Sequence, residues 1–243
     1  MNSDAKPIHI TLQGKGGVGK SLAATLLAQY LVDKGVQVDC YDTDPVNDTF
    51  SQYAALNVAR CEILRTASDI NPRVFDGLIK ALLGSDRVTV IDNGAATFVP
   101  LMAYMVENRV VELLQASARP VILHSVLAGG QAFADTCHGL ETLLSAYDAP
   151  AVVWVNEYFG PVEREGRSFE QSQLYANHAE RIRGIVRIGR GNADTFAKDL
   201  ELMLVRKMTF KEALESEDFH IMPRQRLKMT RDAIFQQLDR IDM

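Results

Sequence analysis

The stretch LQGKGGVGKS, from Leu12 to Ser21, decides the fold class of this chain. It fits the phosphate-loop pattern of a glycine, four free positions and Gly-Lys-Ser, here Gly14, Gly19, Lys20 and Ser21. The pattern is specific where the loop follows a buried strand and opens a helix. Both conditions are met, because the run IHITLQ precedes the loop and the Ala/Leu-rich run KSLAATLLAQYLVDK follows it. We therefore predict a nucleotide-binding α/β fold.

The residue types of the loop predict its chemistry. Glycines let backbone N–H groups point at phosphate oxygens, and the dipole of the following helix adds positive potential. We expect Lys20 to contact the β- and γ-phosphates and the Ser21 hydroxyl to ligate Mg²⁺. The residues of this segment predicted to contact the nucleotide are Gly14, Lys15, Gly16, Gly17, Val18, Gly19, Lys20, Ser21 and Leu22. The general pattern does not require Lys15, so this second cation needs its own explanation.

The composition is that of an ordinary globular protein. Of 243 residues, 47% are hydrophobic and 23% are charged, and the net charge of −5 gives no general attraction to polyanions. Three widely spaced cysteines suggest neither a disulfide framework nor a metal cluster. The sequence shows neither a signal peptide nor an apolar stretch long enough to span a membrane, so we expect a cytoplasmic protein.

Short apolar runs alternate with helix-length segments along most of the chain. The predicted strands are IHITLQ from Ile8, VQVDCYD from Val36, RVTVID from Arg87, PVILHSV from Pro120, AVVWVN from Ala151 and GIVRI from Gly184. The predicted helices are Lys20–Lys34, Pro72–Leu83, Val99–Ala116, Gln131–Ala146, Ser168–Ala179, Asn192–Lys207, Thr209–Glu215 and Arg224–Ile241. The βαβ alternation predicts a P-loop NTPase fold: a mostly parallel, doubly wound sheet flanked by helices, with a helical C-terminal segment.

We expect one domain over residues 1–243, with the C-terminal helices at about 192–243 packed on it. Two regions fall outside the βαβ alternation. The polar segment Asn156–Gln171 is long for a loop, and loops of that length are usually functional or mobile. The last helix has an apolar side comprising Leu227, Ile234, Phe235, Leu238 and Ile241. Packing inside the protein is favoured over membrane or partner docking, because acidic residues lie among the basic ones on its polar side.

Three acidic residues follow two predicted strands. Asp42 and Asp44 end the second strand in YDTDP, and Asp92 ends the third in VTVID. Ligands of open α/β sheets bind at the carboxyl ends of the strands. Carboxylates at this place can hold Mg²⁺ through water or orient an attacking water, although Asp-Pro clusters also begin turns. We predict that Asp92 supports Mg²⁺ together with Ser21, and the residues alone leave open which of these two roles Asp42 and Asp44 take.

Asn156 ends another core strand in VVWVN. An amide side chain both donates and accepts hydrogen bonds, so it can recognise the ring edge of adenine. Taken alone, Asn156 is better explained as a turn residue that ends a strand.

Together these motifs resemble a known family. KGGVGKS with its early lysine, DTDP and VID look like the ParA/MinD group of deviant Walker A ATPases. Within that group, four stretches are similar to the TraL family of plasmid conjugation proteins. They are LQGKGGVGKS, DTDPVN, VIDNGA with the nearby FVPL, and NEYFGPVEREGRSFEQ, supported by RQRLKMTRD near the end.

The resemblance implies an ATPase, weak without a partner, that forms a homodimer on binding ATP and Mg²⁺. In the family the early lysine reaches the partner's phosphates, which implies a catalytic role in trans for Lys15 beside Lys20. It also implies that Asp44 orients the attacking water, that Asp42 supports Mg²⁺ and that Asn156 lies in the adenine pocket. A protein partner in plasmid transfer or maintenance is expected.

The chain departs from the family pattern at two places. Val46 and Asn47 follow DTDP where Gln is common, and NGAATF follows Asp92 where the family often has Thr or Ser with prolines. The second change falls at the expected γ-phosphate-sensing switch, so we expect the response to the γ-phosphate to differ from that of the family.

Two other functions stay open. One is a partition ATPase that binds DNA nonspecifically, for which the arginines of RIRGIVRIGRG could supply contacts. The other, less favoured, is a metabolic P-loop phosphotransferase similar to dethiobiotin synthetase, with the segment Asn156–Gln171 lining its substrate pocket.

Overall fold

The computed structural model describes residues 6–61, 64–66, 69–70 and 73–243. Its centre is a seven-stranded sheet in the order β11-β8-β7-β1-β6-β2-β3, and each pair of neighbouring strands is parallel. The strands are β1 Ile8–Thr11, β2 Val38–Asp42, β3 Ala59–Arg60, β6 Val88–Asp92, β7 Val121–Ala128, β8 Ala151–Asn156 and β11 Ile182–Ile188. This confirms the predicted doubly wound P-loop fold.

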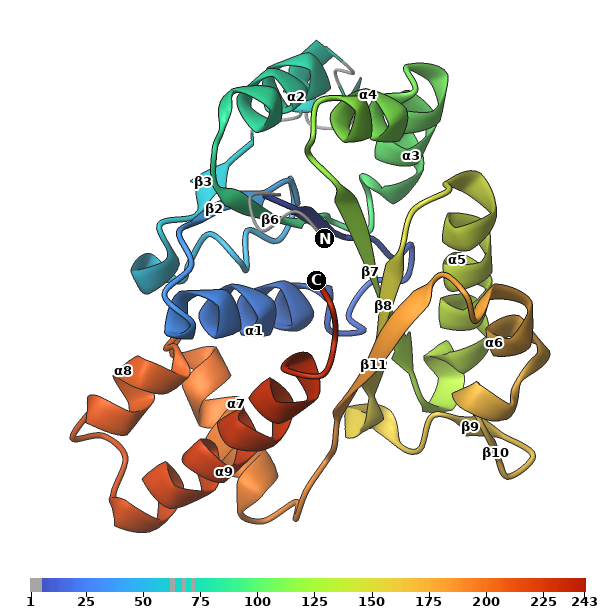
Figure 1. Ribbon diagram of the computed structural model, residues 1–243. Coiled ribbons are helices and arrows are strands. Elements are labelled where there is room, and N and C mark those ends of the chain that lie inside the picture. The colour runs from blue at the N-terminus through green and yellow to red at the C-terminus, as the bar shows by residue number, and fades with distance from the viewer. Residues whose placement is uncertain (1–5, 62–63, 67–68, 71–72) are drawn as a thin grey trace.

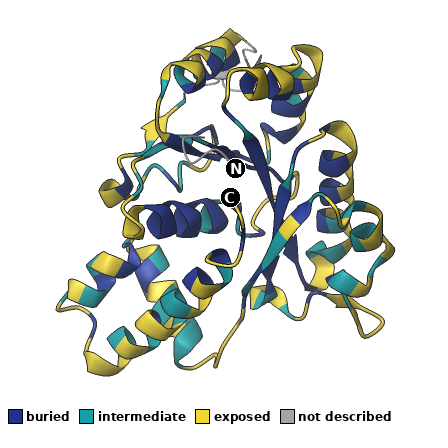
Figure 2. Cartoon of the chain, in the orientation of Figure 1, coloured by how far each residue is buried: buried dark blue, intermediate teal, exposed yellow. Residues whose placement is uncertain are grey.

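Helices cover both faces of the sheet (Figure 1). One face carries α1 Lys20–Asp33, α7 Phe196–Val205, α8 Phe210–Glu215 and α9 Ile221–Leu238. The other carries α2 Arg73–Gly84, α3 Phe98–Glu107, α4 Val110–Ala116, α5 Phe133–Ala146 and α6 Gln173–His178. Since both faces are covered, β6, β7 and β8 are buried along their whole length (Figure 2), which explains their continuous apolar runs.

Alternate residues of the central strands serve the two halves of the core. Ile8 and Ile10 of β1 face the cluster formed with α2 to α5. Ile122 and Val126 of β7 face the cluster formed with α1 and the C-terminal helices. This division follows from the period of two along a strand. Successive residues of these strands are therefore buried on opposite faces of the sheet.

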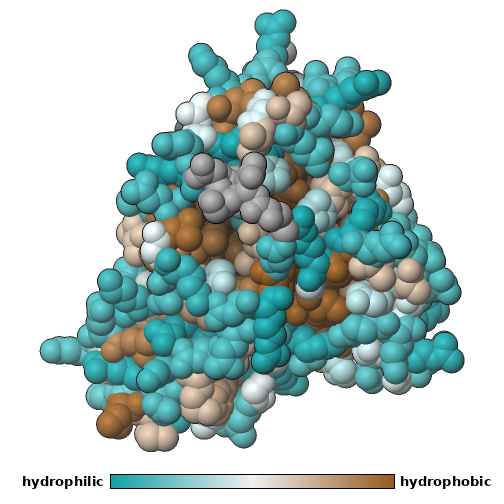
Figure 3. Space-filling model, in the orientation of Figure 1, coloured by the Kyte–Doolittle hydropathy of each residue, from teal (hydrophilic) through white to brown (hydrophobic). Residues whose placement is uncertain are grey.

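The C-terminal helix packs as predicted. Its apolar side chains Leu227, Ile234, Phe235, Leu238 and Ile241 are all buried, in the cluster that also contains the buried face of α1. By contrast, Ile221 and Met222 at the start of α9 are 81% and 57% exposed, and hydrophobic side chains show at the lower left of Figure 3, where α9 begins. Among the described residues, no helix has the length and apolar character needed to cross a bilayer.

Two predicted helices differ from the structure. The segment Val99–Ala116 forms two helices, because Arg109 has a φ of 47°, outside the right-handed helical range. Within Ser168–Ala179 only α6 is α-helical, and a short 3₁₀ turn with a Ser168–Gln171 capping box precedes it. The predicted start of the second helix at Pro72 lies outside the described residues.

The polar segment after β8 contains short regular elements. A 3₁₀ turn at Glu157–Phe159 leads into a hairpin of β9 Glu163–Arg164 and β10 Arg167–Ser168. The two turn residues between these strands, Glu165 and Gly166, have φ values of 53° and 73°. Positive φ at both positions is the requirement of a two-residue hairpin turn with primed geometry.

A buried arginine joins the N-terminal ends of three strands. Arg119 donates from Nε to Lys6 O at 3.0 Å, from Nη1 to Leu82 O at 2.7 Å, and from Nη2 to Arg87 O at 2.9 Å. These carbonyl groups lie before β1, in α2 and before β6. Arg119 therefore satisfies backbone acceptors that would otherwise be buried without donors. The sequence pattern offered no sign of this role.

Candidate functional site

The phosphate loop connects the end of β1 to the start of α1. Gly14 to Gly17 are exposed, and Gly17 and Gly19 have φ values of 72° and 105°. At Gly19 a Cβ atom would also lie 2.7 Å from Asn156 Nδ2, so both backbone and space require glycine there. α1 begins at Lys20, directly after the loop. The N-terminal amides of the helix and the exposed glycines therefore form one anion-binding surface.

Lys20 is folded into the loop of its own chain. Its ammonium donates to Lys15 O at 2.9 Å, and its side chain is buried. Burial lowers the pKa of Lys20, whereas the nearby carboxylates of Asp92 and Asp44 raise it. The position of Lys20 fits the phosphate-contacting role predicted from the sequence.

The two strand-ending carboxylates lie on neighbouring strands at the same level. Asp42 and Asp92 are partners in the parallel register of β2 and β6, and both are buried. Asp42 is fixed by its own loop, because it accepts hydrogen bonds from Asp44 N and Ser51 N, each at 2.9 Å. Burial raises the pKa of Asp42, and these amide donors oppose the shift.

Asp92 differs from Asp42 because neither of its carboxyl oxygens makes a hydrogen bond with a described residue. Burial raises the pKa of Asp92 to about 7, and the nearby Ser21 hydroxyl and Lys20 ammonium lower it. Ser21 thus lies close enough to lower the pKa of Asp92, although its hydroxyl does not form a well-aligned hydrogen bond with that carboxyl group. A buried carboxyl group without a partner needs a cation or donor to complete its environment.

These groups fit Mg²⁺ in the manner of a nucleotide site. Such sites use a hydroxyl, one or two carboxylates, water and substrate phosphates instead of a complete protein cage. Accordingly, the described part of the chain contains no cluster of three His, Cys, Asp or Glu side chains arranged around a metal ion. Ser21 would hold the ion, with Asp92 and Asp42 behind it.

Asp44 lines the same hollow of about 600 Å³ as Gly16, Lys20 and Ser21. It is half-buried, and its Oδ1 atom accepts from Val46 N at 2.9 Å and from Asn47 N at 3.1 Å. The structure therefore brings Asp44 to the phosphate loop, as the sequence predicted.

Lys15 belongs to the phosphate loop, but its side chain extends away from the loop to α5. Its ammonium forms an ion pair with Asp135 Oδ2 at 2.7 Å, and the two side chains are 44% and 58% exposed. Asp135 stands in the first turn of α5, and the Lys15 ammonium lowers its pKa. The sequence did not predict Asp135, since 120 residues separate the two partners.

Gln13 ties the loop to the core. Its buried side chain donates to Val126 O at 3.1 Å and to Thr136 O at 3.0 Å. Those acceptors lie in β7 and α5. At Gly139 a Cβ atom would lie 2.1 Å from Gln13 Oε1, so α5 approaches this side chain closely. The loop and the helix that holds Lys15 are thus connected through Gln13.

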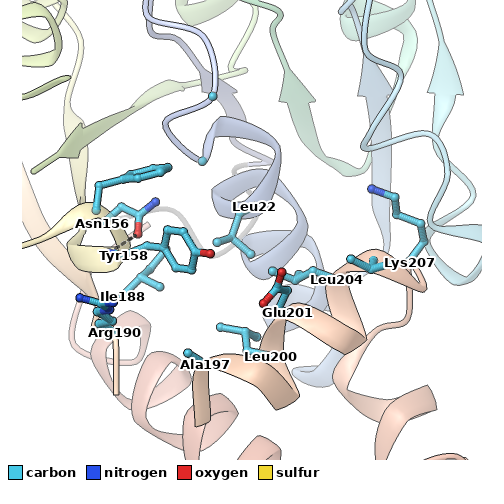
Figure 4. Close-up of a pocket in the computed structure, with 15 residues that line it drawn as sticks. Leu22, Asn156, Tyr158, Ile188, Arg190, Ala197, Leu200, Glu201, Leu204 and Lys207 are labelled. Atoms are coloured by element: carbon cyan, nitrogen blue, oxygen red, sulfur yellow. Dashed lines mark hydrogen bonds between the residues drawn. The ribbon is translucent and has the colours of Figure 1, made fainter. Parts of the chain in front are cut away.

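Asn156 contacts the phosphate loop directly. Its Nδ2 atom donates to Val18 O at 2.9 Å, and its Oδ1 atom accepts from Tyr158 N at 3.1 Å. Asn156 also lines a mainly apolar pocket of about 330 Å³ beside the loop (Figure 4). Tyr158 faces this pocket from one side, and Leu200 and Leu204 of α7 face it from the other. The pocket has the size and apolar character that a nucleotide base requires.

Most of this pocket wall was not predicted from the sequence. Leu200, Glu201 and Leu204 come from a helix more than 170 residues beyond the loop, and their spacing is that of any amphipathic helix. Leu22, which was predicted, also lines the pocket.

The arginine run of β11 is engaged within the chain. Arg181 donates to the carbonyl oxygens of Tyr147 and Leu144, and Arg183 donates to Asp242 O. Arg187 pairs with Glu157 and Glu170, and Arg190 lines the apolar pocket beside the loop. These contacts give each arginine of the run a place in the fold.

The phosphate loop, the acidic strand ends and the parallel sheet together define a P-loop nucleotide-binding protein. The domain family described as CobQ/CobB/MinD/ParA nucleotide binding domain matches residues 10–213, and the chain belongs to this family. Two curated relatives, both called Protein TraL and both from Escherichia coli, are 47% and 44% identical over 234 residues. Each alignment covers 96% of this chain and 97% of the relative. The resemblance stated from the sequence is confirmed.

Solved structures agree on the fold. The MinD cell division protein of Aquifex aeolicus aligns with a TM-score of 0.53 at 14% identity, over 95% of this chain and 97% of that one. The apo McdA structure from Cyanthece aligns with a TM-score of 0.52 at 14% identity, over 92% and 98% of the two chains.

Proposed function

We propose that this chain is an ATP-binding protein that dimerises around ATP, hydrolyses it slowly and acts as a switch in plasmid conjugation or maintenance. Membership of the nucleotide-binding family supports the binding of a nucleotide. The identity to TraL proteins over nearly the whole chain supports a role in plasmid transfer.

The observation that carries this proposal is the position of Lys15. Lys20 already provides the cation inside the loop, whereas the Lys15 side chain points away to Asp135 at the protein surface. A loop with a second, exposed lysine can offer that cation to a phosphate bound in another chain. Exposed ion pairs contribute little to stability, so Lys15 can leave Asp135 at a small cost when phosphate is present.

Each of these residues has a separate role in the binding and hydrolysis of ATP. The amides of Gly16 to Ser21 and the Lys20 ammonium bind the β- and γ-phosphates. Asp44 accepts a hydrogen bond from the water that attacks the γ-phosphorus, and ADP leaves as the bond to its β-phosphate oxygen breaks. Lys15 of the partner subunit offsets negative charge on the transferred group, much as an arginine finger does. Mg²⁺, when bound, neutralises phosphate charge beside Ser21.

Slow hydrolysis follows from two features of the single chain. One Asp44 oxygen is held by the amides of its own loop, and the Lys15 ammonium is held by Asp135. The catalytic set is therefore complete only after a second chain supplies Lys15. An activating protein partner would act by stabilising that arrangement.

The test is the oligomeric state of the protein with ADP, ATP and a slowly hydrolysed ATP analogue, measured by analytical ultracentrifugation. ATP and the analogue should give dimers, and ADP should not. Lys15→Ala should abolish the ATP-dependent dimer, while Asp44→Ala should retain ATP binding and prolong the dimer. A monomeric Asp44→Ala protein in saturating ATP would contradict the mechanism.

The same samples separate the proposal from a nonspecific DNA-binding function. That function requires ATP-dependent retention of arbitrary duplex DNA that falls steeply between two salt concentrations. The contacts of the β11 arginines do not favour it.

A further inference from the structure

Two loops that carry the acidic residues are joined by a buried polar cluster. Its members are Thr43 in the loop after β2, Asn93 in the loop after β6, and Thr97 directly before α3. Asn93 Oδ1 accepts from Thr97 Oγ1 at 2.8 Å and lies 3.1 Å from Thr43 Oγ1. Thr43 N also donates to Asp92 O at 2.9 Å. The segments Asp42–Asp44 and Asp92–Gly94 are thus fastened to each other beneath the phosphate hollow.

Gly94 provides the surface on which Asp44 rests. A Cβ atom at Gly94 would lie 2.5 Å from Asp44 Cγ, 2.7 Å from Asp44 Oδ1 and 2.9 Å from Asp44 Cα. These distances are shorter than real Cβ contacts, and one of the atoms belongs to the backbone. Gly94 does not have a positive φ, so space, and not backbone conformation, requires glycine here.

We propose that Gly94 and the Thr43–Asn93–Thr97 cluster are positioning elements that set the direction of the Asp44 carboxylate for hydrolysis. This inference rests on the proposed ATPase function. None of the four residues needs to contact the nucleotide. They act through Asp44, whose Oδ1 atom also accepts from two amides of its own turn.

A purely structural role explains the cluster less well. Buried polar networks are costly unless every member is satisfied, and apolar residues of similar volume would pack these loops without that cost. A polar network does, however, fix one geometry, because each hydrogen bond has a preferred direction. The site needs such a fixed geometry, since misplacing a reacting group by about 1 Å can reduce a rate by about 100-fold.

The first experiment adds one methyl group beside Asp44. Gly94→Ala should lower kcat for ATP hydrolysis by about 10- to 100-fold, while KM and the Kd for ATP change by less than about threefold. The matched control is Gly77→Ala in α2, where an added Cβ meets no atom within 4 Å. This control should keep the kcat of the wild type.

The second experiment removes one hydroxyl from the cluster. Thr97→Val should lower kcat with little change in KM, whereas Thr97→Ser keeps the donor to Asn93 and should restore most of the rate. Thr142→Val is the control, because the exposed Thr142 hydroxyl donates to His138 O within α5, away from the cluster. The Thr97 variants still test the positioning role if Gly94→Ala fails to fold.

A third measurement tests the contact without hydrolysis. Gly94→Ala should lower Tm more in the wild type than in Asp44→Ala, because the second background lacks Asp44 Cγ and Oδ1. Equal Tm losses in the two backgrounds would overturn the proposed contact. If the wild type hydrolyses ATP and both Gly94→Ala and Thr97→Val keep its kcat, the positioning role is wrong. If the wild type hydrolyses no ATP, the proposed function itself fails.

Discussion

Acid should destabilise this protein through a pair of histidines buried in the sheet. His124 accepts from Trp154 Nε1 at its Nδ1 atom, at 2.9 Å, and an indole N–H can only donate. His124 therefore carries its proton on Nε2 and donates it to His9 Nδ1, also at 2.9 Å. Neither ring has room for a second proton without breaking this chain. Burial accordingly lowers the pKa of His9 from 6.5 to about 3, and that of His124 also falls.

The size of the effect follows from that pKa. The unfolded chain protonates His9 below pH 6.5, but the folded chain does so only near pH 3. Stability from His9 is thus fully present above pH 6.5 and is lost as the pH falls toward 3. Between pH 7 and pH 5 the loss is about 2 kcal/mol for this one group. His124 acts in the same direction.

The assay is urea unfolding of the nucleotide-free protein at pH 7, 6 and 5. The fluorescence of Trp154, the single tryptophan, reports the transition. His9→Leu should lower stability at every pH but should lose about 2 kcal/mol less than the wild type between pH 7 and pH 5. His220 is exposed, so the stability of the control variant His220→Gln should have the same pH dependence as that of the wild type. Parallel curves for the wild type and His9→Leu would refute the reasoning.

Three further predictions concern other contacts. Asn156→Asp replaces the donor to Val18 O with a carboxylate. The free energy of unfolding, measured by urea titration, should fall by about 1–3 kcal/mol, and the Kd for ATP, measured by calorimetry, should rise. Asp135→Asn weakens the hold on Lys15, so the dimer should form at a lower ATP concentration in ultracentrifugation, and an unchanged concentration would contradict the role of this pair. Arg119→Met leaves several buried carbonyl groups without donors, so the free energy of unfolding in urea should fall by at least about 3 kcal/mol. The ATP affinity should not change, because Arg119 lies at the N-terminal ends of the strands and the phosphate loop lies at their carboxyl ends.

Local patterns predicted six of the seven strands of the main sheet, but not β3, which is an exposed pair of residues at its edge. Continuous apolar runs predicted β6, β7 and β8, and the turn from β1 into α1 is encoded within ten residues. The break between α3 and α4 was missed, since both helices have the same apolar periodicity and only the φ of Arg109 separates them. Periodicity reports which face is buried but not whether the backbone stays helical.

For the candidate site, short motifs were enough to predict the residues that neighbour one another in the chain: Gly14 to Ser21, and the carboxylates that end β2 and β6. Parallel strands bring their carboxyl ends to the same side of a sheet, so Asp42 and Asp92 lie next to each other. The partners that lie far along the chain could be identified only from the folded structure. Asp135 beside Lys15, Gly94 beneath Asp44 and α7 across from Asn156 depend on how the loops and helices pack. The packing of helices and loops depends on many weak contacts between residues throughout the chain, so it cannot be predicted from any short segment.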